Sequence, residues 1–298
     1  MPPPYPLLLH TFPSSEGKTL QAFQHPSSNS SQSPSNALVF VPGLGDRAVS
    51  IPYTRRLSAS LPPSYTLFEP SLSSASSAFG YSSLSQDAAE LQSFVTYLRT
   101  HLSISKIILM GHSTGCQDCL EYVLTYGEEP KDRVDGIVLQ GPVSDREAIN
   151  MTCDRIQVEE SIKAAEDMMQ TGRMNEVMQS ASLPEGWRGS PVTAYRWLSL
   201  AAKGGHDDYF SSDLSDDKLE NIWGRLRQPV LILPSGKDEW VPELIDVEVM
   251  VERWKRFCPE GIASELSGLI PGANHRVEGA EEGERWLVDR VVKFLEGI

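Results

Sequence analysis

The sequence predicts an α/β protein in which a mostly parallel sheet carries helices on both faces and a helical segment is inserted into the chain. Short apolar runs alternate with helix-like stretches along most of the 298 residues, which is typical of strand-helix-strand units. Several of these runs are apolar throughout, as strands buried on both faces require. Between residues 145 and 227 the strand signals stop and helical patterns take their place.

The sheet is expected to begin with strands at residues 7–12 and 19–23. The Ser-rich segment 27–35 follows them and has the composition of a disordered linker. Residues 37–41 read Ala-Leu-Val-Phe-Val, which predicts a buried strand. This strand ends in the loop 42–46, with the sequence Pro-Gly-Leu-Gly-Asp.

A helix at about 51–60, a strand at 65–68 and a Ser-rich loop at 71–82 are expected next. Ser83 and Gln86 then have the spacing of a capping box, which pairs a residue before a helix with one in its first turn. The apolar positions that follow lie on one helical face. We therefore expect a long helix to begin at Ser83.

The strand at 106–110 runs directly into Gly-His-Ser-Thr-Gly at 111–115, ahead of a helix that ends near Tyr126. This spacing puts Ser113 on a sharp turn between strand and helix. Glycines two residues before and two after it allow the chain to approach closely there. The pattern alone recurs by chance, but a strand before it and a helix after it favour a nucleophilic serine.

After a strand at 136–140, residues 145–227 are expected to form a helical cap, and residues 1–144 and 228–298 the core. Helix-like segments in the cap are expected at 158–169, 174–180, 192–202 and 214–223. An insertion at this point of the chain would lie over the carboxyl edge of the sheet, where open α/β sheets bind ligands. The cap aromatics Trp187, Tyr195, Trp197 and Tyr209 either contact a substrate or form the small core of the cap.

The alternation resumes with a strand at 229–233, a helix at 242–257, a strand at 263–270 and a helix at 281–295. Asp238 follows the first of these strands and His275 follows the second. A serine hydroxyl needs a histidine to take its proton and a carboxylate to orient that histidine. The order Ser113, Asp238, His275 is the one found in α/β-hydrolases, so these three residues are our catalytic candidates.

Each candidate has competitors. Asp238 could cap the following helix, and Glu239 is an acid one residue away. The other histidines are His10, His25, His101, His112 and His206. His275 is preferred because it lies in a loop directly after the last strand, next to Gly272. His112 is expected to pack or line the site, and His206 to lie in a solvated loop of the cap.

Two backbone N–H groups are expected to form the oxyanion hole, which stabilises the negative oxygen of the tetrahedral intermediate. Thr114 follows the nucleophile and supplies the first. Leu44 is the candidate for the second, because the loop 42–46 follows the third strand. Proline stands here where a His-Gly-x-Gly motif has histidine, so Gly45 and Asp46 remain alternatives to Leu44.

The composition limits the partners. With 26 basic and 40 acidic residues the net charge is −14, which argues against nucleic acid and anionic membranes. No apolar run is long enough for a membrane span, and the chain starts without a basic segment, so a cytoplasmic location is expected. Cys116 and Cys119 fall inside a predicted helix and are expected to be buried free thiols. We expect no cofactor and no metal.

A narrower resemblance rests on Val-Pro-Gly-Leu-Gly-Asp at 41–46, Gly-His-Ser-Thr-Gly-Cys-Gln-Asp at 111–118 and Gly-Ala-Asn-His at 272–275. These motifs resemble those of fungal α/β-hydrolases that include intracellular siderophore esterases of the fusarinine C hydrolase type. The resemblance implies hydrolysis of the ester bonds of hydroxamate siderophores, such as fusarinine C or its triacetylated form, which releases iron inside the cell. The substrate partner would then be a ferric siderophore.

Other activities fit the same residues. A carboxylesterase, a lipase, a thioesterase or an acyltransferase would use the same triad on a different acyl group. A binding protein on a hydrolase scaffold is the alternative from another class, because fold alone does not fix function. The residues by themselves predict an enzyme acting on a small-molecule ester.

Overall fold

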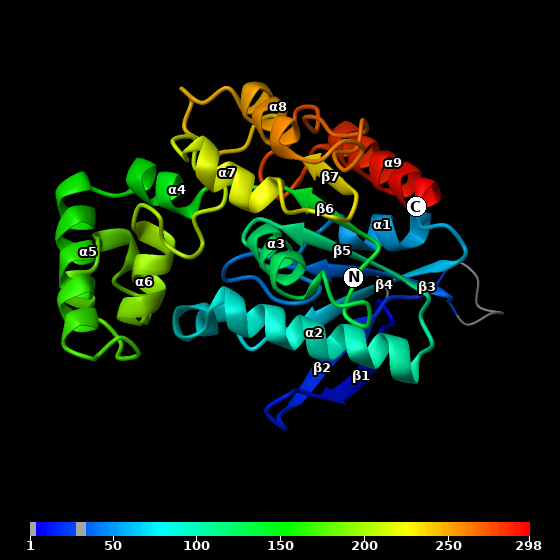
Figure 1. Cartoon of the computed structure of the whole chain (residues 1–298), viewed down its shortest axis with the longest axis horizontal. Helices are drawn as coiled ribbons and strands as arrows, with labels where there is room; N and C mark the ends of the chain where they lie inside the picture. Colours follow the sequence, from blue (N-terminus) through cyan, green and yellow to red (C-terminus); the bar gives the residue numbers. More distant parts are fainter. Residues whose placement is uncertain (1–3, 28–33) are drawn as a thin grey trace.

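The computed structural model describes residues 4–27 and 34–298 (Figure 1). Most of the Ser-rich segment 27–35 therefore lies outside the described residues. The described part has a central sheet with helices on both faces, and a group of helices, α4, α5 and α6, to one side of it.

Seven strands form the sheet in the order β1-β2-β4-β3-β5-β6-β7. They are β1 Leu8–Pro13, β2 Thr19–Gln24, β3 Asn36–Val41, β4 Tyr65–Ser71, β5 Lys106–His112, β6 Gly136–Gln140 and β7 Val230–Leu233. The pairs from β4 through β3, β5 and β6 to β7 are parallel, and β2 pairs antiparallel with both β1 and β4. The predicted mostly parallel sheet is confirmed.

Helices cover both faces because side chains alternate along each strand. In β3, Leu38 and Phe40 pack in the cluster with α1 and α9, whereas Val39 and Val41 pack in the cluster with α2, α3, α7 and α8. The helices are α1 Thr54–Ser60, α2 Leu84–His101, α3 Gly115–Tyr126, α4 Asp145–Thr152, α5 Arg155–Gln170, α6 Ala194–Ala201, α7 Asp216–Trp223, α8 Val247–Phe257 and α9 Glu281–Gly297. Short 3₁₀ turns lie at Ser76–Tyr81, Ser180–Ser182 and Glu185–Trp187.

Helix α2 begins as predicted. The hydroxyl oxygen of Ser83 accepts a hydrogen bond from the backbone N–H of Gln86 at 3.1 Å, which satisfies one of the donors that a helix start leaves unpaired. The buried residues that follow in α2, including Leu91 and Phe94, pack in the cluster on the sheet face covered by α2, α3, α7 and α8.

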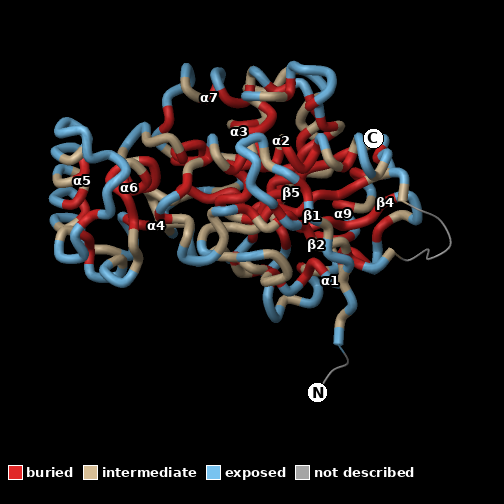
Figure 2. Tube along the Cα trace, turned by 90° about the horizontal axis from the view of Figure 1, so that it is seen from below, coloured by how far each residue is buried: buried red, intermediate tan, exposed pale blue. Residues whose placement is uncertain are grey.

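Helices α4, α5 and α6 share a hydrophobic cluster of their own, and Figure 2 shows their buried positions apart from those around the sheet. Trp197 is fully buried in this cluster, and its indole N–H donates to the Ser161 hydroxyl at 3.0 Å. Phe210 and Trp223 lie further along the chain and pack instead against the sheet, in the cluster that includes α2, α3, α7 and α8. The extent of the cap, residues 145–227, stays a prediction.

The helix predicted at 174–180 is wrong. The backbone of this segment pairs with residues 192–195: Met178 N–H donates to Val192 O at 2.9 Å, and the carbonyl of Met174 accepts from Tyr195 N–H at 2.9 Å. These groups are therefore not available for bonds along a helix. Residues Asp145–Thr152 form α4, a helix that was not among those predicted for this region.

The strand predicted at 263–270 is also wrong as a regular strand, because only Ala263 and Ile270 form bridges to the β7 region. Between them, Ile232 N–H of β7 donates to the hydroxyl of Ser267 at 3.0 Å rather than to a backbone carbonyl. The segment still runs parallel to β7. Helix α8 begins at Val247, later than expected, because the Asp246 carboxylate caps it by accepting from Val249 N–H at 3.1 Å.

Candidate active site

Ser113 occupies the sharp turn between β5 and α3 and has a φ of +55°, a value that non-glycine residues rarely adopt. The chain around it is crowded. A Cβ on Gly111 would lie 2.2 Å from the carbonyl oxygen of Gly115, and a Cβ on Gly115 would lie 2.2 Å from that of Val41. Both glycines are therefore required for this turn, as the motif predicted.

Asp238 and His275 form a hydrogen-bonded pair. Nδ1 of His275 lies 2.8 Å from Oδ2 of Asp238, and their side chains are only 6% and 2% exposed. A carboxylate accepts hydrogen bonds, so Nδ1 carries the hydrogen and Nε2 is the nitrogen that can take a proton. The pair thus has the geometry by which an acid orients a basic imidazole.

The neighbouring acid, Glu239, contacts a different part of the same residue. Its Oε2 accepts a hydrogen bond from the backbone N–H of His275 at 2.8 Å. The two loops meet because Lys237 N–H donates to the carbonyl of Ala273 at 2.8 Å. Asp238 therefore orients the imidazole ring, whereas Glu239 holds the backbone of the loop.

Ser113 and His275 both line a cavity of about 630 Å³, a size typical of small-molecule sites. One wall comes from loops after the parallel strands and the other from α4 and the turn at Glu185–Trp187. Its larger apolar side chains are Leu44, Phe79, Val143, Ile149, Trp187 and Trp240. The carboxyl groups of Asp46 and Asp145 and the guanidinium of Arg276 add charge to the lining.

The loop after β3 approaches the nucleophile closely, since a Cβ on Gly43 would lie 2.6 Å from the Cβ of Ser113. Asp46 N–H donates to the carbonyl of Gly43 at 3.0 Å, so this alternative oxyanion donor already has a partner. Leu44 lines the cavity beside Ser113, and Thr114 is buried directly after it. Their roles in an oxyanion hole stay predictions.

Of the other histidines, His112 lies beside His275 in the cavity, whereas His206 pairs with Glu121 of α3. His112 is buried and lines the cavity, and its ring centroid lies 4.9 Å from that of His275. Burial, together with the nearby His275, holds the pKa of His112 well below its usual range. His206 is half-buried and pairs with Glu121, with Nε2 and Oε1 3.3 Å apart.

The remaining histidines bond to side chains away from the cavity. The nearest nitrogen of His10 lies 2.8 Å from the side chain of Gln24, that of His25 lies 2.8 Å from Glu69, and that of His101 lies 2.8 Å from the hydroxyl of Thr100. Of the aromatic residues predicted to lie in a cap, Trp187 lines the cavity, whereas Trp197 is buried in the hydrophobic cluster shared by α4, α5 and α6.

Sequence reasoning missed three polar residues of the site. Asp145 and Arg276 line the cavity, and Gln140, the last residue of β6, bonds to the backbone carbonyl of His275. Asp145 accepts from the Gln117 side-chain amide at 2.8 Å, and its removal from water raises its pKa to about 7. A polar residue at the end of an otherwise apolar strand was the one signal that pointed to Gln140.

Cys116 and Cys119 are both buried free thiols. Within residues 4–27 and 34–298, no three His, Cys, Asp or Glu side chains are grouped closely enough to hold a metal ion. Across the same residues, no helix has the length and apolar character needed to cross a membrane.

Comparison with known proteins gives a consistent set of relatives. A family model described as "Protein of unknown function (DUF1749)" matches residues 1–296. The chain is 30% identical to Esterase AN6793 of Emericella nidulans, over 98% of this chain and 92% of that protein. It is 29% identical to Fusarinine C esterase sidJ of Aspergillus fumigatus, over 88% of this chain and 89% of that protein. Among solved structures, the siderophore hydrolase EstB of Aspergillus fumigatus superposes with a TM-score of 0.79 at 28% identity, covering 99% of this chain and 98% of EstB.

Proposed function

The chain belongs to the DUF1749 family and has the α/β-hydrolase fold of fungal siderophore esterases, and from this premise we propose that it is a serine esterase. Its substrates are proposed to be hydroxamate siderophores such as fusarinine C or its triacetylated form. The observation that carries the proposal is the convergence of the strained Ser113 turn and the Asp238–His275 pair on one cavity. The names of the relatives support the substrate class.

In the proposed mechanism, Ser113 Oγ attacks the ester carbonyl while Nε2 of His275 takes the hydroxyl proton. Asp238 stays ionised and holds the imidazolium that forms. The N–H groups of Leu44 and Thr114 donate to the developing oxyanion. His275 then returns the proton to the leaving alcohol, and an acyl-enzyme remains.

Water completes the cycle. His275 takes a proton from the water as it attacks the acyl carbonyl, and the proton returns to Ser113 Oγ when the carboxylic acid leaves. The apolar side chains of the lining, among them Trp187 and Trp240, suit the hydrocarbon part of an ester substrate. Iron in a ferric siderophore belongs to the substrate.

A fluorophosphonate probe tests the nucleophile, because it forms a covalent bond only with an activated serine. Wild type should be labelled and Ser113→Ala should not. Ser93→Ala is the control for an unactivated serine, since Ser93 is buried and its hydroxyl donates to the carbonyl of Ala89 within α2. Unlabelled wild type that is folded would favour the binding-protein alternative.

The substrate class is tested by incubating wild type with ferric fusarinine C, its triacetylated form, a triglyceride and an aryl thioester. Mass spectrometry identifies the products. Release of the hydroxy-acid units of the siderophore, abolished in Ser113→Ala, is the expected result. Hydrolysis of the triglyceride or the thioester alone would contradict the siderophore assignment and leave an esterase of another class.

A further inference from the structure

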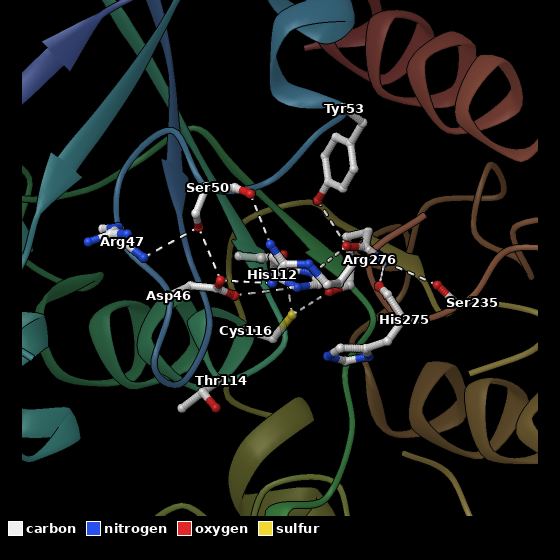
Figure 3. A network of polar contacts seen from close by, with 12 residues as sticks. Asp46, Arg47, Ser50, Tyr53, His112, Thr114, Cys116, Ser235, His275 and Arg276 are labelled. Carbon is white, nitrogen blue, oxygen red and sulfur yellow. Dashed lines mark hydrogen bonds and ion pairs between the residues drawn. The ribbon is translucent and has the colours of Figure 1, made fainter. Parts of the chain in front are cut away.

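Gln140, the last residue of β6, is fully buried and its side chain bonds to four separate segments of the chain. Its Oε1 accepts from the hydroxyl of Tyr53 at 2.8 Å and from Nδ1 of His112 at 2.5 Å. Its Nε2 donates to the hydroxyl of Ser235 at 3.3 Å and to the backbone carbonyl of His275 at 3.3 Å. Figure 3 shows these four partners converging on one point.

The orientation of the Gln140 amide follows from its partners. A backbone carbonyl only accepts hydrogen bonds, so the amide nitrogen must face His275. The amide oxygen therefore faces Tyr53 and His112, and Nδ1 of His112 must donate to it. Two donated and two accepted bonds use the full capacity of the amide, and a buried network satisfied in this way is rigid.

The backbone of Gln140 holds the nucleophile turn at the same time. Its carbonyl accepts from the backbone N–H of Ser113 at 3.0 Å and from the thiol of Cys116 at 3.3 Å. One residue thus contacts the Ser113 turn through its main chain and the His275 loop through its side chain. These two segments are far apart in the sequence, and Gln140 joins them directly.

We propose that Gln140 is a positioning residue that fixes the loop carrying His275 relative to the turn carrying Ser113. This inference rests on the proposed esterase function, for which it names a further residue. It assigns a task distinct from that of Asp238: Asp238 orients the imidazole ring, whereas Gln140 holds the backbone from which the ring extends. Small displacements between reacting groups lower the rate steeply, so loss of this contact should act on catalysis.

The test compares Gln140→Met with Gln228→Met. Gln228 is the matched control, because it is also a buried glutamine and its amide donates to the carbonyl of Gly127 at 3.2 Å, away from the cavity. For an aryl ester, Q140M should lower kcat by roughly 10- to 100-fold with KM within about 3-fold. Q228M should change kcat by less than about 2-fold, even where the two variants lose similar amounts of thermal stability.

Gln140→Glu distinguishes the bonds that the amide oxygen accepts from those that the amide nitrogen donates. A carboxylate at this position can still accept from Tyr53 and His112 but cannot donate to the carbonyl of His275. If the contact to His275 sets the rate, Q140E should be as slow as Q140M. Where Q140M does not fold, Q140E is compared with Ser235→Ala, which removes one acceptor of the amide but leaves the bond to the His275 carbonyl in place. Q140E should then be the slower of the two.

Fluorophosphonate labelling distinguishes failure of this inference from failure of the proposed function. Unlabelled wild type would refute the esterase. Wild type that is labelled, with Q140M labelled at the same rate or no slower than Q228M, would overturn only the role of Gln140. A labelling rate that falls in parallel with kcat in Q140M is the expected result.

Discussion

Nη1 of Arg276 lies 2.8 Å from Oδ1 of Asp46, so an ion pair joins the residue after His275 to the loop that carries Leu44 (Figure 3). Nη2 of the same guanidinium donates to the carbonyl of Ser50 at 2.9 Å. The two loops expected to supply the base and an oxyanion donor are therefore held together by one side chain. The pair is partly shielded, with 35% and 15% of its side chains exposed.

A double-mutant cycle with Arg276→Met and Asp46→Asn should give a coupling energy of about 1 kcal/mol, the upper end for pairs of this exposure. Urea denaturation measures the free energies of unfolding. Lys293 and Asp289 in α9 form a control pair at the same 2.8 Å distance but with about half of each side chain exposed. A coupling no larger than in this control pair would contradict the expected stabilisation.

Asp238→Asn should lower kcat by roughly 10³- to 10⁴-fold, because asparagine can hold His275 in the wrong tautomer. Glu239→Gln is the matched variant, since its side chain bonds only to the His275 backbone N–H, which a neutral amide oxygen can also accept. It should lower kcat by less than about 10-fold. Steady-state kinetics on an aryl ester measures both. Equal losses in the two variants would mean that Asp238 is not the acid of the triad.

Gly115→Ala should destabilise the protein by about 3 kcal/mol, because its Cβ would overlap the carbonyl oxygen of Val41. Gly189→Ala provides the control, since no atom lies within 4 Å of the Cβ position there. It should change stability by less than about 0.5 kcal/mol. Thermal unfolding measures the difference, and a G115A variant as stable as G189A would disprove the crowding of the turn.

Asp145→Asn should stabilise the protein more at pH 8 than at pH 5. Burial raises the pKa of Asp145 from 3.8 to about 7, so between these values the folded state keeps a proton that the unfolded state has lost. The carboxyl group therefore lowers the stability of the wild type as the pH rises from about 4 to 7, and the asparagine removes this loss.

A pKa rise from 3.8 to about 7 would correspond to about 4 kcal/mol of lost stability at pH 8. Asp145 borders the cavity and keeps some contact with water, so we expect Asp145→Asn to stabilise the protein by about 2 kcal/mol at pH 8. Urea denaturation at both pH values measures the effect. Asp167→Asn, at an exposed position of α5, is the control. A pH dependence no greater than in that control would contradict the buried character of Asp145.

The parts of the site that the sequence predicted are those with a local signature. Ser113 was identified because its turn needs glycines at fixed spacing, and the structure gives the steric reason for each. Asp238 and His275 were predicted because each follows an apolar run expected to be a strand, at the carboxyl edge of a parallel sheet. Their contact could be expected without knowing the path of either loop.

Gln140 and Arg276 could not be identified in this way. Several of their partners lie more than 80 residues away in the chain, among them Tyr53 and His275 for Gln140 and Asp46 for Arg276. A single polar residue at the end of a strand does not specify which side chains it meets. The helix predicted at 174–180 and the regular strand predicted at 263–270 were wrong for a related reason. In both, long-range hydrogen bonds to another segment decide the backbone conformation, and periodicity within a short window does not contain that information.

The irregular pairing of residues 263–270 also determines where the sheet can be extended by another molecule. A regular outer strand offers an unbroken row of N–H and C=O groups, which a strand of a second chain can join. At β7 this row is already occupied. Val230 N–H donates to the carbonyl of Ile262 at 2.8 Å, Gly268 N–H donates to the carbonyl of Ile232 at 3.0 Å, and the Ser267 hydroxyl accepts from Ile232 N–H. At the opposite edge, β1 is regular and carries the exposed side chains of Leu8 and Leu9. Edge-to-edge aggregation is therefore favoured at β1 and disfavoured at the β7 side.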